Sequence, residues 1–76
     1  MGTIYEQDDI CIRKQLLCAR LLGLPSNEDV YFYQGYDKST NMFCELTTGI
    51  NVEQEKPVKR IIAELLRQRK QNETVA

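Results

Sequence analysis

The length of this chain constrains its fold most, because 76 residues can build only one small hydrophobic core. A chain of this size buries only about 60% of the surface that it exposes when unfolded, so its stability is marginal without a partner. Its apolar content of 42% and charged content of 28% are typical of a globular protein. We therefore expect a single domain over residues 1–71, followed by a flexible tail over residues 72–76.

The first third of the chain has the signals of a long helix. Thr3 and Glu6 have the spacing of an N-terminal capping box, and Gly23 followed by Pro25 is typical of a helix end. We therefore predict a helix over residues 4–22. On a helical wheel its apolar residues cover most of the circumference, which is more surface than the rest of the chain can bury.

The remainder indicates a β-hairpin followed by a second helix. Residues 30–36 are aromatic and β-favouring, and residues 42–47 alternate in polarity after a turn-rich segment. Pro57 suits the first turn of a helix over residues 57–71, whose apolar stripe includes Ile61 and Leu65. The expected fold class is α+β, a small α-β-β-α domain in which two helices pack on the antiparallel hairpin.

One apolar row of the first predicted helix favours self-association. The row consists of Ile10, Leu17, Leu21 and Leu24. Packing it on a second chain would remove several side chains from water, each worth roughly 1.5–3 kcal/mol. We predict a two-fold homodimer through this row. The alternative is that the hairpin and the second helix cover the row within one chain.

The second predicted helix has a basic outer face. Its cations are Lys56, Lys59, Arg60, Arg67 and Lys70. The ordinary interpretation is a solvated face whose positive charge suits the C-terminal end of the helix dipole. The functional interpretation is an anionic partner, either a nucleic-acid backbone or an acidic protein groove.

The predicted hairpin carries aromatic side chains on both faces. We expect Tyr31, Tyr33 and Phe43 to share one face as an aromatic docking surface, with Phe32 and Tyr36 on the other. The hairpin register decides this grouping, and the sequence leaves the register open. Ordinary cross-strand packing is the alternative to docking, and base stacking lacks the interleaved cations that such platforms usually carry.

The sequence offers little chemistry for catalysis. It has no histidine, which removes Ser-His and Cys-His nucleophile pairs. Cys11, Cys18 and Cys44 lack the short spacing of structural zinc ligands, and an odd number does not suit a disulfide framework. We therefore expect buried thiols, no metal, no cofactor and no enzymatic activity.

We predict a small protein-protein interaction module, a regulator, adaptor or inhibitor, that acts as a homodimer and binds an unidentified protein. Its size is typical of phage or mobile-element inhibitors. The alternative is a nucleic-acid-binding regulator that uses the basic helix face. Residues 1–6 lack the layout of a secretion signal and no apolar run is long enough for a membrane span, so we expect a cytoplasmic protein without membrane contact.

Overall fold

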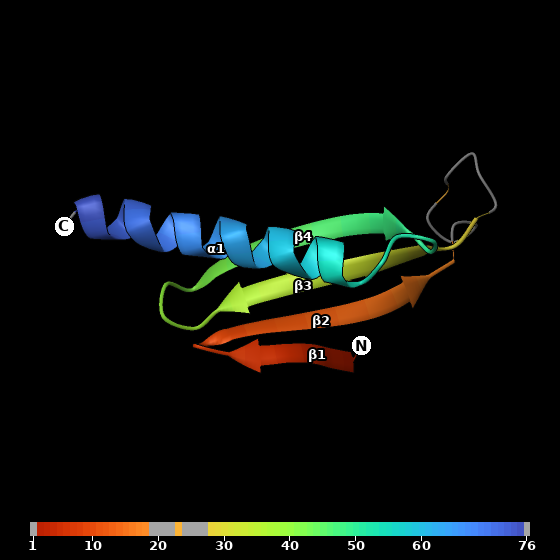
Figure 1. Ribbon diagram of the computed structural model, residues 1–76, viewed down its shortest axis with the longest axis horizontal. Helices are drawn as coiled ribbons and strands as arrows, with labels where there is room; N and C mark the ends of the chain where they lie inside the picture. The colour runs from red at the N-terminus through yellow and green to blue at the C-terminus, as the bar shows by residue number, and fades with distance from the viewer. Residues whose placement is uncertain (1, 19–22, 24–27, 76) are drawn as a thin grey trace.

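The chain folds into an antiparallel sheet with a C-terminal helix on one of its faces (Figure 1). The computed structural model describes residues 2–18, 23 and 28–75, without the side chains of 73–75. Within these residues the strand order is β1-β2-β3-β4, and every neighbouring pair is antiparallel. The elements are β1 Gly2–Gln7, β2 Ile10–Leu17, β3 Val30–Asp37, β4 Met42–Gly49 and α1 Glu55–Val75.

The predicted first helix is wrong wherever the structure describes it, because its residues form β1 and β2. Asp8 and Asp9 have φ angles of 53° and 68° and make the tight turn between these strands. Ile10 and Ile12 point to one face of the sheet and Cys11 to the other, so the apolar pattern that seemed to surround a helix has a period of two. The class α+β is confirmed, but the element order is β-β-β-β-α. Residues 19–22 lie outside the described residues.

The predicted hairpin is confirmed, and it forms β3 and β4. The turn between them contains Asn41 in the left-handed region, with φ 58°, and its backbone N–H donates to the Asp37 carbonyl at 2.8 Å. The register pairs Tyr36 with Phe43, so these two rings share a face. The predicted grouping of Phe43 with Tyr33 is therefore wrong by one residue of register.

Helix α1 covers one face of the sheet and packs mainly on β4 and β3 (Figure 1). It begins two residues before Pro57 and continues to Val75, through residues that the sequence placed in the tail. The core between helix and sheet consists of Ile10, Ile12, Tyr33, Ile61 and Leu65. Ile61 and Leu65 of the predicted apolar stripe are thus confirmed as core residues, whereas the next residue of the helix, Leu66, is 44% exposed.

Gly35 in β3 sets how closely the helix approaches the sheet. A Cβ atom at this position would lie closer than 3.0 Å to Cγ2 of Ile61 and 3.3 Å from Cδ1 of Leu65. The helix therefore crosses the sheet where the strand has no side chain, and the two core residues of α1 fill that space.

We expect Gly35→Ala to lower the free energy of unfolding by about 1–3 kcal/mol, because the added methyl group must displace the helix. Gly49→Ala is the matched control, since a Cβ atom there meets nothing within 4 Å. Urea unfolding of both variants measures the effect. Equal stability of the two variants would contradict the close approach.

Candidate functional site

The face of the sheet turned away from α1 is the candidate site, and we call it the open face. No described helix or strand covers it. Side-chain alternation and the strand pairings place on it Thr3, Glu6, Cys11, Arg13, Gln15, Leu17, Val30, Phe32, Gln34, Tyr36, Phe43, Glu45 and Thr47. It combines aromatic, aliphatic and charged residues, whereas the solvated face of a two-layer domain is usually polar.

An aromatic pair dominates one end of the open face. The rings of Tyr36 and Phe43 lie 4.6 Å apart between centroids at an interplanar angle of 33°. The Tyr36 hydroxyl donates to Oδ1 of Asn41 at 2.6 Å, which fixes this ring. Phe43 is 54% exposed, and Phe32 lies half-buried further along β3. The open face therefore keeps aromatic surface in contact with water.

The open face also contains a hollow of about 410 Å³. Its lining comes from all four strands and the β3–β4 turn: Thr3, Glu6, Cys11, Arg13, Gln34, Tyr36, Lys38 and Phe43. Aromatic carbon, a thiol and opposite charges thus border one space. Such a mixture suits the side chains of a protein better than it suits a single small anion.

The charges of the open face balance. Glu6 and Lys38 approach to 3.6 Å at its margin, and both are more than half exposed. Arg13 and Glu45 occupy one cross-strand row, on either side of Gln34. Within the described part of the chain neither of these two makes an ion pair, so each charge faces outward.

The predicted docking surface does not exist as one surface. Tyr33 is fully buried beneath α1, and Tyr31 lies on the same side of the sheet. The Nζ atom of Lys14 lies 4.0 Å from the centroid of the Tyr31 ring. Phe43 points to the opposite face. The structure keeps only Phe43 of these three on the open face and adds Tyr36 and Phe32, because the β3–β4 register pairs Phe43 with Tyr36.

The predicted dimer row is also divided, because it assumed a helix. Ile10 is 2% exposed and belongs to the core under α1, whereas Leu17 lies half-buried on the open face. Leu21 and Leu24 lie outside the described residues. Of the two members of this row that the structure describes, Leu17 is the one that lies where a partner of the open face would reach it.

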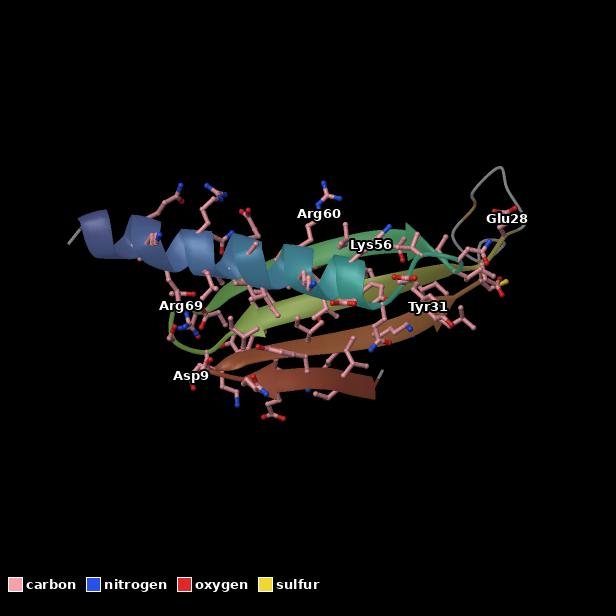
Figure 2. All side chains as sticks on the ribbon, viewed as in Figure 1. Asp9, Glu28, Tyr31, Lys56, Arg60 and Arg69 are labelled. Atoms are coloured by element: carbon pink, nitrogen blue, oxygen red, sulfur yellow. The ribbon has the colours of Figure 1, made fainter. Side chains whose placement is uncertain are left out.

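The basic helix face is present as predicted. All five of its cations, Lys56, Lys59, Arg60, Arg67 and Lys70, are exposed. Lys59 pairs with Glu55 at 2.8 Å, and Arg67 pairs with Glu64. Arg60 extends away from the body of the helix (Figure 2). These short-range pairs neutralise part of the face, so its field is weaker than five cations suggest.

A buried ion pair that the sequence did not reveal joins the helix to two turns. The Asp37 carboxylate is 0% exposed and accepts hydrogen bonds from Nε and Nη2 of Arg69 at 2.6 and 2.9 Å and from Ser39. Arg69 also donates to the Asp8 carbonyl, as its position beside both turns in Figure 2 illustrates. The Arg69 hydrogen bonds hold the pKa of Asp37 well below its usual range. This pair is structural. The one sequence signal for it was Arg69, a cation on the apolar side of the helix.

The described cysteines do not form a site. All three are unpaired, half-buried thiols, and burial raises the pKa of Cys44. Among the described residues no group of three or more metal-ligating side chains comes together. No helix in that part of the structure is long and apolar enough to cross a bilayer.

Comparison with known proteins gives no relative. No protein-family model, no curated protein and no solved structure matches the chain.

We expect Asp37→Asn to lower the free energy of unfolding at pH 7 by about 1–3 kcal/mol. An Asn side chain is neutral and has one acceptor oxygen, whereas Arg69 donates to both oxygens of the Asp37 carboxylate. A carboxyl group with a lowered folded-state pKa stabilises above its unfolded pKa of about 4 and loses that contribution as the pH falls. The difference in the free energy of unfolding between the parent and Asp37→Asn should therefore become smaller as the pH falls below about 4. Glu53→Gln, at an exposed carboxylate, is the control for urea unfolding. A difference that is independent of pH would contradict the role of this carboxylate.

Proposed function

We propose that this protein is a small, non-enzymatic protein-interaction module and that the open face of its sheet is the binding surface. The single observation that carries the proposal is the aromatic pair of half-buried Tyr36 and exposed Phe43, on a sheet face that no described helix or strand covers. A regulator, adaptor or inhibitor would use such a face against a larger protein or against itself.

The composition of the face supports a protein partner. Aromatic residues are enriched in protein interfaces, and charged residues are depleted at their centre and collect at the rim. Here Tyr36 and Phe32 lie on β3, one of the two inner strands, and the pair of Glu6 and Lys38 lies at the margin. Arg13 and Glu45 are the charged residues nearer the centre. An exposed apolar patch rimmed by polar residues is typical of an interaction site.

Electrostatics make the open face a poor nucleic-acid surface. Its described charges are Glu6, Arg13, Lys38 and Glu45, two of each sign. Stacking platforms for single strands combine aromatic rings with an excess of positive charge along the backbone path. The open face supplies the rings without that excess.

A nucleic-acid function remains as the second candidate, and it rests on the outer face of α1. The observation in its favour is that all five basic residues of this face are exposed on one helix. Of these, Lys56 and Arg60 make no ion pair with another described residue. Such a face would bind phosphates without sequence specificity.

The interaction module predicts that a photo-reactive benzoylphenylalanine in place of Phe43 crosslinks to protein in the native host cell, because this aromatic position lies at the binding surface. The same group in place of Lys59, on the outer side of α1, is the control and should give little protein adduct. Mass spectrometry of the adducts measures both. Absence of any protein adduct at position 43 would overturn the proposal.

The second candidate predicts binding to a mixed-sequence DNA duplex that weakens as salt rises. With Lys56 and Arg60 as the phosphate contacts, log K should fall against log salt with a slope of roughly −2, whereas five contacts would give roughly −4.5. Fluorescence anisotropy at several salt concentrations measures the slope. Lys56→Glu combined with Arg60→Glu should abolish binding. If the parent shows no salt-dependent affinity, this second function is excluded.

A further inference from the structure

We propose that the open face binds the open face of a second copy of this chain, with the two sheets stacked about a two-fold axis that runs along β3. The proposal rests on the proposed function and names its partner. Opposite charges within one cross-strand row, and complementary side chains in the neighbouring rows, favour this arrangement.

The decisive row contains Arg13, Gln34 and Glu45. The register pairs Arg13 with Gln34 and Gln34 with Glu45, so opposite charges stand one strand to either side of β3. A two-fold axis along β3, midway between two stacked sheets, places β2 of one copy over β4 of the other. Arg13 of each copy then faces Glu45 of the second copy, and two ion pairs form from charges that have no partner within the described residues.

Other two-fold arrangements of the same faces lack this match. An axis that crosses the strands at the level of Gln34 would bring Arg13 over Arg13 and Glu45 over Glu45. Like charges across an interface are strongly unfavourable. Shifting that axis along the strands by one residue, half the spacing of the rows, places Arg13 over Gln15 and Glu45 over Thr47, which pairs neither charge. The charge pattern therefore selects the axis along β3.

The geometry of stacked sheets allows the proposed ion pairs. Strands lie about 4.8 Å apart and packed sheets about 10 Å apart. Stacked sheets are rotated by about 30° to each other. At one strand from the axis this rotation moves facing residues only about 2–3 Å along the strand. An arginine side chain is long enough to reach a carboxylate over that distance.

The rows on either side also match in this arrangement. Phe43 faces Cys11 of the second copy, and thiol sulfur packs favourably against aromatic rings. Phe32 faces Phe32 and Val30 faces Val30. Gln34 faces Gln34, whose amide can donate and accept at once. Leu17, which belongs to the dimer row predicted from the sequence, lies opposite Gly49 of the second copy. Gly49 has no side chain, and no atom lies within 4 Å of the position of its absent Cβ, so there is room for the leucine.

Charges at the margin remain in water. Glu6 on β1 lies two strands from the axis, beyond the edge of the other sheet, so its pair with Lys38 stays at the rim. Pairing of two β1 edges is the less suitable alternative, since the register of β1 is irregular between Thr3 and Tyr5. Such irregularities discourage strand addition at an edge.

The expected affinity is moderate because the face is small. Eight residues of strand span about 26 Å, and the three strands that overlap across the axis span about 10–15 Å. The overlap is therefore roughly 250–400 Å² of projected area per chain, below the about 800 Å² per partner of a standard interface and in the range of weak, transient ones. We therefore expect a monomer–dimer equilibrium in the micromolar range.

Sedimentation equilibrium of the full chain over about 1 μM to 1 mM tests the proposal. We expect the mass to approach twice 8.8 kDa. Arg13→Glu alone and Glu45→Arg alone should each weaken association at least about tenfold, because each creates two like-charge contacts. The double variant Arg13→Glu with Glu45→Arg should restore association. Arg60→Glu, a charge reversal on α1, should have no effect, and circular dichroism confirms that each variant is folded.

A parent that stays monomeric at every concentration would overturn this inference, as would a dimer that the single variants do not weaken or the double variant does not restore. The crosslinking experiment at position 43 tests the proposed function independently of the oligomeric state. A monomeric chain whose position 43 crosslinks to a different protein keeps the interaction module and rejects self-association. A monomeric chain without protein adducts, or with nucleic-acid adducts only, rejects both.

Discussion

The ion pair between Arg69 and Asp37 fixes the position of the helix on the sheet. One guanidinium reaches the carboxylate at the end of β3 and the Asp8 carbonyl in the β1–β2 turn, so it joins the helix to the two adjacent turns at one end of the sheet. Charge-assisted bonds of this kind have narrow geometry, unlike apolar contacts, which tolerate sliding. Gly35 gives Ile61 and Leu65 room to approach the sheet, so the ion pair and these apolar contacts together hold α1 in place.

A single helix can cover only one face of a four-stranded sheet, and this limit leads to the proposed function. The covered face contains the fully buried Tyr33, Ile10 and Ile12. The other face retains Phe43, Tyr36 and Phe32, side chains that gain free energy when water is removed from them. A chain with so small a core has little stability in reserve. A partner that binds the open face would also raise the stability of the chain, because any partner that binds only the folded state shifts the folding equilibrium toward it.

Part of the fold could be predicted from the sequence. The hairpin followed from the aromatic run that begins at Val30 and from the turn residues after Asp37, and the helix followed from Pro57 and the spacing of Ile61 and Leu65. The first segment could not be predicted in this way. Thr3 and Glu6 have helix-capping spacing by coincidence, and the Asp8–Asp9 turn lacks the glycine that usually marks a two-residue hairpin turn. An apolar pattern of period two in a short segment looks like a helix with too many apolar sides.

The sequence by itself determined the small single core, the class α+β, the basic outer face of the helix and the lack of histidine chemistry. These depend on composition and on patterns within about ten residues. Only the tertiary structure decided the strand pairing, and with it which aromatic residues share the open face and that Arg13 and Glu45 flank Gln34 in one row. Pairing joins residues that are distant in sequence, and a shift of one residue moves every side chain of a strand to the opposite face. For this reason the residues of the proposed binding surface became recognisable only once the register was known.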